Sequence, residues 1–324
     1  MADNLTFTSI IDTNYLFSLF SANSAQISNF EATNSTSLLQ DLIDVRYSTG
    51  VTFSNFTLAN VNNTVITVSN SYITEMSGMD IQNSLKAFYI VKSTVKLLKD
   101  SVFSRNGADG STTGGAFQIY NSDVSIQNTS FSNNIADTGA GIHFDCNSMT
   151  LCNLLLVNST FNSNGAVTKG GAIYYGFNKP VSTYMVFSNN SAPYGPDLAS
   201  YAVKIRIQGS DTDVIVLDNL GSGIATEEVL ILELLDFDNQ VMVLNNEDQI
   251  SISSLNRSIA SVAGVSSRQL SRGAAAFDNF ITTAEPGSKN IALHTNSKVI
   301  SSKNSAFTDI RSKFFLMQEA YNGL

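Results

Sequence analysis

The stretch TTGGAFQIYNSDVSIQNTSFSNN, residues 112–134, contains a Gly-Gly pair that could belong to a phosphate-binding loop. A phosphate loop is one glycine-rich turn between a strand and a long helix, and its backbone N–H groups surround the anion. Here the glycines precede alternating apolar residues, Phe117, Ile119, Val124 and Ile126, instead of residues at helical spacing. The arrangement also recurs along the chain, so the sequence favours a structural turn over a nucleotide site.

Carboxylates are the next candidates, because glycan-cleaving enzymes need two or three acids on one face, with calcium or a basic residue beside them. The scattered acids of the repeat region are Asp100, Asp109, Asp123, Asp137 and Asp145. Asp109 and Asp137 each precede a glycine turn, so they could stack in neighbouring coils. Aspartate is common in turns, and the sequence therefore predicts solvated turn residues and no catalytic residue.

No metal or cofactor site is expected. His143 and His294 each lie alone in a predicted strand, without a second ligand or a nucleophile motif. An acidic run flanks one predicted hairpin and offers oxygen ligands for calcium, but its spacing is not that of an EF-hand. Solvated loop acids are the favoured interpretation of this run, which comprises Glu233, Asp236, Asp238, Glu247 and Asp248.

Two further features leave alternatives open. Cys146 and Cys152 are too far apart for a CxxC metal pair, and they form either a local disulfide in an oxidising compartment or two buried thiols. The aromatics Tyr174, Tyr175 and Tyr201 could provide a sugar-stacking face, although strand alternation sends one of each adjacent pair into the core.

Composition excludes some classes of function. Apolar residues make up 43% of the 324 residues and charged residues 14%, and the net charge is −9 without a Lys/Arg cluster, so nucleic acid is not an expected partner. No apolar stretch has the length of a membrane span, and the N-terminus does not resemble a signal peptide. Eight Asn-x-Ser/Thr sequons point mildly toward a secreted glycoprotein: Asn4, Asn34, Asn55, Asn62, Asn128, Asn158, Asn189 and Asn256.

The glycine turns belong to a repeat that is clearest over residues 93–200. A Phe-x-x-Asn motif occurs four times, with successive phenylalanines 28, 30 and 26 residues apart, and a glycine turn follows each copy. Fainter copies lie nearer the N-terminus, but no register can be fixed between Asn60 and Lys92. The repeat positions are Phe103, Asn106, Gly114, Gly115, Phe131, Asn134, Gly139, Phe161, Asn164, Gly170, Gly171, Phe187 and Asn190.

A repeat of this length with alternating apolar residues predicts a parallel β-helix. Each coil would contain two or three short strands that pair with the next coil at about 4.8 Å. The phenylalanines would stack in the interior, and the asparagines would take the left-handed conformation at corners. The glycines would allow bends where no Cβ fits. The Gly114-Gly115 pair is therefore predicted to be a corner.

These motifs also carry a resemblance. Gly-Gly-Ala followed by an aliphatic residue or Phe, combined with Phe-x-x-Asn, resembles the repeats of bacterial polymorphic outer-membrane proteins and of large protist surface proteins. The resemblance implies a right-handed parallel β-helix of the pectin-lyase-like class. Where such proteins have a known role they are adhesins or surface proteins, so it implies attachment and not catalysis.

After the sequence PYGPDLASY (193–201) the pattern changes to longer strands. Short strands separated by turn signals suggest an immunoglobulin-like β-sandwich over 202–305, after the β-helix of residues 1–201. The string from Gly273 to Phe280 is similar to the closing strands of Ig-like domains in invasin-type adhesins, and residues 306–324 have no assignment. The predicted strands are 202–207, 214–217, 229–235, 241–244, 250–252, 259–262, 274–277 and 291–293.

The sequence thus predicts an all-β chain, a right-handed parallel β-helix solenoid followed by an Ig-like β-sandwich. The expected function is a non-catalytic adhesin-like structural or binding module at the cell surface or outside the cell, within a larger protein. Its expected partners are glycans or surface proteins. The alternative is a carbohydrate-active β-helix enzyme of the polysaccharide lyase or hydrolase kind, which a groove of clustered carboxylates on one solenoid face would favour.

Overall fold

The computed structural model describes residues 2–8, 16–34, 41–107, 110, 112–146, 152–210, 214–217, 221–226, 229–285, 288–303, 314–319 and 321–322. The chain divides into two compact units, Met1–Ser200 and Tyr201–Leu324, and each is treated by itself. Strands dominate both units, and the described residues contain a single short helix, α1 (Lys298–Lys303). The all-β prediction is confirmed.

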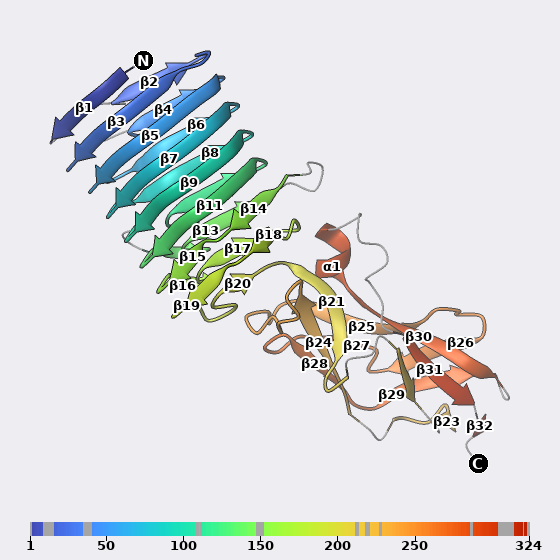
Figure 1. Ribbon diagram of the computed structural model, residues 1–324. Helices are drawn as coiled ribbons and strands as arrows, with labels where there is room; N and C mark the ends of the chain where they lie inside the picture. The colour runs from blue at the N-terminus through green and yellow to red at the C-terminus, as the bar shows by residue number, and fades with distance from the viewer. Residues whose placement is uncertain are drawn as a thin grey trace. The chain divides into compact units, whose positions relative to one another are not determined.

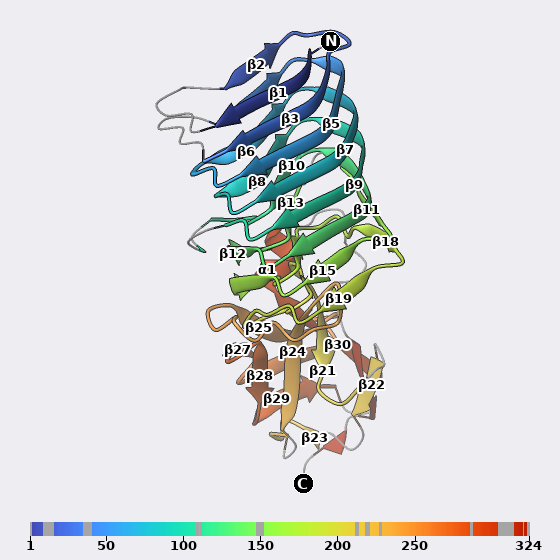
Figure 2. The same cartoon turned by 60° about the vertical axis from the view of Figure 1, so that its left-hand side comes forward.

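The first unit is a parallel β-solenoid, in which strands of successive coils stack side by side (Figures 1 and 2). Sheet A is the largest and contains β1 (Ala2–Thr8), β3 (Gln26–Thr33), β5 (Thr49–Ala59), β7 (Tyr72–Gln82), β9 (Thr94–Ser104), β11 (Asp123–Ser132), β14 (Leu154–Val157), β15 (Thr160–Asn162), β18 (Val181–Thr183) and β19 (Val186–Ser188). Sheet B contains β2 (Phe17–Phe20), β4 (Ile43–Arg46), β6 (Thr64–Ser69), β8 (Lys86–Val91), β10 (Phe117–Tyr120), β13 (Ile142–Asp145), β17 (Ile173–Tyr175) and β20 (Leu198–Ala199). Sheet C pairs β12 (Ile135–Thr138) with β16 (Gly165–Lys169).

Coil length differs along the solenoid. Equivalent residues Ser84 and Asn106 are 22 positions apart, whereas Asn106 and Asn134 are 28 apart and Asn134 and Asn164 are 30 apart. The coils after Asn106 contain the glycine turn, and those after Asn134 and Asn164 also contain the strands of sheet C. Because the short coils lack the glycine turn, the repeat register could not be read from the sequence between Asn60 and Lys92.

Apolar columns fill the interior of the solenoid. The side chains that alternate inward on sheets A and B are buried, and residues in register stack on one another from coil to coil. On sheet A, Phe103, Phe131 and Phe161 are directly paired in register, and on sheet B Phe88 pairs with Phe117. Rings of the two sheets also meet, because the Phe103 and Phe117 ring centroids are 4.7 Å apart.

The second unit consists mainly of antiparallel sheets. One contains β21 (Ala202–Ile207), β24 (Leu230–Asp236) and β28 (Ala274–Phe277). A five-stranded sheet has the order β22 (Val214–Leu217), β31 (Phe314–Glu319), β30 (Lys289–Ser297), β25 (Gln249–Ser254) and β27 (Ser267–Gln269). Two small sheets pair β26 (Ala260–Gly264) with β29 (Phe280–Ala284), and β23 (Gly221–Ser222) with β32 (Tyr321–Asn322).

Both larger sheets of the second unit contribute to one apolar core. Ile205, Leu232 and Phe277 from the first sheet cluster with Ile250 and Leu293 from the second. The unassigned C-terminal residues enter this architecture through β31, which pairs antiparallel with β30 and parallel with β22. The predicted strand at 241–244 is reduced to a single bridge between Leu235 and Val241, followed by a turn.

The phenylalanine column gives a test of the solenoid core. Phe161→Ala removes a fully buried ring that stacks on Phe131 at 4.7 Å and on Phe187 at 5.5 Å. We expect the free energy of unfolding of the solenoid to fall by about 3–5 kcal/mol, measured by urea denaturation followed by circular dichroism. Val167→Ala, at an exposed position of the same coil, is the control and should change it by less than about 0.5 kcal/mol. Equal effects of the two substitutions would contradict the inward stack.

Candidate functional site

The phenylalanines of the Phe-x-x-Asn repeat form a continuous column. Ring stacking links Phe103 to Phe131 at 5.4 Å, Phe131 to Phe161 at 4.7 Å and Phe161 to Phe187 at 5.5 Å. The faint copies nearer the N-terminus belong to a different column, because Phe30 pairs in register with Phe56, and Phe56 pairs with Met79. The aliphatic residue Ile81 is the register partner of Phe103 in the preceding coil.

The asparagines of the motif form a second, buried column. The Nδ2 group of Asn106 donates to Oδ1 of Asn134, that of Asn134 to Asn164, and that of Asn164 to Asn190, at 2.9–3.1 Å. Each Oδ1 also accepts the backbone N–H of the equivalent residue in the preceding coil. The prediction that these asparagines adopt the left-handed conformation is wrong. The positive φ belongs instead to the residue before each asparagine: Arg105, Asn133, Ser163 and Asn189.

The glycines lie at a corner of the longer coils. Gly114, Gly139, Gly170 and Gly195 have positive φ between 58° and 69°. At Gly115 a Cβ would lie 2.3 Å from the carbonyl oxygen of Ile135, and at Gly171 it would lie 2.3 Å from that of Pro196. Only glycine fits where backbones of neighbouring coils approach this closely.

Three further columns of corner residues have left-handed backbone, and most of their side chains reach solvent. One divides the strands of sheet A, one follows sheet A and one follows sheet B. Asparagine is the commonest occupant, as its short polar side chain tolerates this conformation. The columns are Asn29, Asn55, Gly78, Asp100, Asn128, Asn158 and Tyr184; Asn34, Asn60, Asn83, Arg105, Asn133, Ser163 and Asn189; and Ser21, Tyr47, Asn70, Lys92 and Asn121.

The residue after a corner is often a buried serine, threonine or asparagine. After the sheet B corner, the Ser71 hydroxyl accepts the N–H of Ser48 and that of Ser93 accepts the N–H of Ser71, at 3.0 and 3.1 Å. These hydroxyls donate in turn to a carbonyl two residues earlier in their own coil. Each side chain thus satisfies a buried backbone group that the bend removes from the sheet ladder. Neither the serine column nor its role was predicted from the sequence.

The candidate acids of the repeat region occupy separate places. Asp100 lies at the corner within sheet A and accepts from Asn128, whereas Asp123 accepts two hydrogen bonds from Asn153. Asp137 is in β12 and Asp145 ends β13. Asp109 lies outside the described residues. Across the parts of the chain that are described, no group of three or more His, Cys, Asp or Glu side chains could hold a metal ion.

The outer face of sheet B carries a row of rings across four coils. Ring centroids are 6.3 Å apart between Tyr89 and Tyr120, 5.7 Å between Tyr120 and His143, and 4.9 Å between His143 and Tyr174. The Lys169 ammonium lies 4.4 Å above the Tyr174 ring. Of the expected sugar-stacking pair, Tyr174 lies in this row but is only 2% exposed, and Tyr175 is fully buried, so both rings are buried. We name Tyr89, Tyr120, His143 and Tyr174 the ring row.

Two basic side chains, His143 in the ring row and Lys86 beside it, are costly to charge. Burial lowers the pKa of Lys86 to about 8 although Asp41 opposes the shift, and the amine contacts the side-chain oxygen of Gln118. Burial, then Lys169 and Lys86, lower the pKa of His143 to about 4, although a hydrogen bond to the Thr138 backbone partly opposes this shift. The Thr138 hydroxyl also lies 3.0 Å from the Nδ1 atom of His143. The imidazole is therefore neutral near pH 7 and acts as a stacking ring and not as a charge.

In the second unit the candidate acids Glu233, Asp236 and Asp248 have protein partners. Glu233 is buried and paired with Arg206 at 2.6 Å. Asp236 is fully buried and accepts the backbone N–H groups of Asp238 and Gln240, at 2.9 and 3.0 Å. The His294 Nε2 atom lies 3.2 Å from the Ser253 hydroxyl, on the neighbouring strand.

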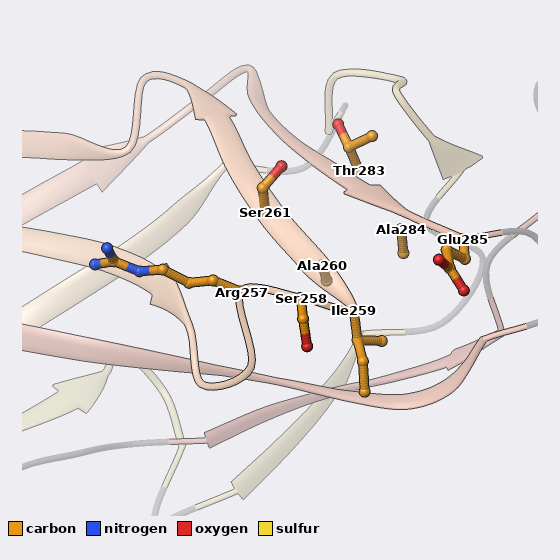
Figure 3. Close-up of a pocket in the computed structure, with 8 residues that line it drawn as sticks. All are labelled: Arg257, Ser258, Ile259, Ala260, Ser261, Thr283, Ala284 and Glu285. Carbon is orange, nitrogen blue, oxygen red and sulfur yellow. The ribbon is translucent and has the colours of Figure 1, made fainter.

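A shallow hollow lies beside β26 and β29 of the second unit (Figure 3). Arg257 and Glu285 extend at opposite ends of it, with Ile259 between them (Figure 3). The remaining lining residues are small: Ser258, Ala260, Ser261, Thr283 and Ala284. This set contains no ring and no convergent pair of acids, so the hollow gives a ligand little to bind.

Cys146 and Cys152 form a disulfide beside sheet B. Among the described residues, no helix has the length and apolar content needed to cross a membrane. In comparisons with known proteins, no family model and no curated protein matched the chain.

The buried asparagine column can be tested at Asn134. Asn134→Ala leaves the Asn106 backbone and side-chain N–H groups without their acceptor, and we expect the free energy of unfolding to fall by about 2–4 kcal/mol. The matched control is Asn133→Gly at the adjacent exposed corner, where φ is 55° and glycine is tolerated. Urea unfolding of both variants checks this prediction. A larger loss of stability in Asn133→Gly than in Asn134→Ala would contradict the roles assigned to these two residues.

His143 predicts a pH dependence of stability. Its pKa is about 4 in the folded chain and 6.5 as an unperturbed side chain, so between these values the unfolded chain binds more protons. The His143 contribution to stability is therefore complete above pH 6.5 and is lost as the pH falls toward 4. We expect wild type to lose about 2–4 kcal/mol more than His143→Gln over this range, as measured by urea unfolding. Parallel pH profiles for the two proteins would contradict the prediction.

Proposed function

We propose that this chain is a non-catalytic binding module of the adhesin type, at the cell surface or outside the cell and within a larger protein. In this proposal the first unit is a right-handed β-helix with polymorphic outer-membrane-protein-type repeats, and the second is an Ig-like sandwich. The observation that best supports the binding function is the repetition of outward-pointing side chains from coil to coil. Corner residues of the same kind lie above one another over many coils, which makes an extended surface of repeated polar groups.

The corner columns offer neutral hydrogen-bonding groups to a partner. The exposed Asn158 side chain donates to Asn128 at 2.8 Å, and Asn55 donates to Asn29 at 3.0 Å. Such amides present further donors and acceptors at the regular spacing of the coils, and they have no proton to transfer near pH 7. They suit recognition of a glycan or of a protein backbone along the solenoid.

Two features support an extracellular location. The Cys146–Cys152 disulfide is of a kind that persists in oxidising compartments. The sequons provide weaker support, because five of the eight asparagines, Asn34, Asn55, Asn128, Asn158 and Asn189, have positive φ and are explained by the corner geometry.

A polysaccharide-cleaving enzyme is the second candidate, and Lys86 is the observation that favours it. Its amine has a lowered pKa and lies near Tyr89 on the outer face of sheet B, where it could serve as a base. The binding module is preferred because Asp100, Asp123, Asp137 and Asp145 are placed at different corners and sheets instead of around this lysine.

Assays of turnover and binding on the same preparation separate the two functions. We expect no reducing ends and no unsaturated products from pectin or alginate, and measurable retention of the chain on a glycan or cell-surface array. Lys86→Met and Asp137→Asn should leave turnover at the level of the buffer control. Product release by wild type that either substitution abolishes would overturn the binding module and favour the enzyme.

A further inference from the structure

The corner residue Tyr47 is poorly suited to its backbone. Tyr47 has a φ of 51° in the column after sheet B, where Asn70 and Asn121 take the same conformation. A bulky aromatic residue is rare and strained in this region, and strain of this kind concentrates at functional sites. The hydroxyl of the buried Ser48 that follows accepts the backbone N–H of Ala22, as the equivalent serines do in other coils. The tyrosine ring is therefore not needed to satisfy the backbone at this bend.

The ring of Tyr47 belongs to an exposed aromatic group. Its side chain is 58% exposed and lies edge-to-face against Phe20, which is 67% exposed, with centroids 5.6 Å apart. Tyr72, 40% exposed, begins β7 in the following coil, and its backbone N–H donates to the carbonyl of Ser48. We name Phe20, Tyr47 and Tyr72 the aromatic corner. Leaving these rings in water forgoes the stabilisation that their burial would give.

Neutral polar groups lie beside the aromatic corner. Thr49, the register partner of Tyr72, lies beside Asn23, and their side chains are 3.4 Å apart. The nearest charge on β4 is Arg46, which is neutralised by Asp44 at 2.7 Å. Hydroxyl and amide groups beside ring faces suit an uncharged, polyhydroxylated ligand better than an acidic or basic peptide.

We propose that the aromatic corner binds a neutral oligosaccharide, with the apolar face of a sugar ring against Tyr47 and Phe20. The rings supply an apolar contact surface with few rotatable bonds, and the neighbouring amides and hydroxyls bind the sugar hydroxyls. This inference rests on the proposed binding function and names one site and one class of ligand for it.

Tyr47→Asn is the sharpest test, because it should separate binding from stability. Asparagine is the residue that the backbone prefers here, so the variant should unfold at a higher urea concentration than wild type while losing the ring. We expect its affinity for cellohexaose, laminarihexaose or chitohexaose, measured by calorimetric titration, to be at least tenfold weaker, and Phe20→Ala to weaken binding likewise. Lys92→Asn, in the same corner column at a φ of 49°, should also raise the unfolding midpoint but leave the affinity unchanged.

The outcomes distinguish this inference from the proposed function. If none of the three oligosaccharides binds, or if Tyr47→Asn and Phe20→Ala bind as tightly as wild type, the sugar site is wrong, while array binding through another surface would leave the adhesin function intact. Binding of a charged peptide that both substitutions abolish would also overturn the assignment to a sugar. Product release from a polysaccharide would count against the proposed function itself.

Discussion

Where strands of neighbouring coils pair in parallel, each coil must repeat the backbone conformation of its neighbour. A bend beside such strands therefore recurs from coil to coil, and three columns of such bends have left-handed backbone in addition to the glycine turn. The bend also removes a buried N–H from the sheet ladder, and that group needs an acceptor. Adjacent residues meet the two requirements. The first adopts the bend and points outward, and the second points inward and accepts the N–H of the preceding coil, as Asn133 and Asn134 do.

This pairing explains which parts of the solenoid could be read from the sequence. The phenylalanine column and glycine turns were visible, because large apolar side chains and a missing Cβ leave few other interpretations at a regular spacing. The asparagines were assigned to the wrong role, since asparagine suits both the corner and the buried column. A signal was available: across the four copies the residue before the asparagine changes between Arg105, Asn133, Ser163 and Asn189. A position that tolerates such variety faces solvent, whereas the constant asparagine is the one held inside.

Other features were hidden for physical reasons. In the short coils Ile81 precedes Phe103 in its column, and any aliphatic side chain of suitable volume fills such a place. The ring row depends on residues from four coils that only the register brings together, so no local pattern in the sequence reveals it. In the second unit β22 and β31 are neighbours in the sheet although about a hundred residues separate them in the chain, and local periodicity carries no information on such pairing.

The division between corner and buried neighbour also shows how this fold can change its surface without losing its core. A corner side chain contributes little to the interior, so replacing asparagine there costs mainly the local strain of the left-handed backbone. Arg105 illustrates this, because its guanidinium reaches back to Asn83 and Gln82 on the outside while Asn106 continues the buried column unchanged. Tyr184 is the corresponding aromatic case in the column within sheet A, at a φ of 54° and 82% exposed. The chemistry of the outer surface can thus change one corner at a time, whereas a substitution in the phenylalanine or asparagine column also alters the contacts of the neighbouring coils.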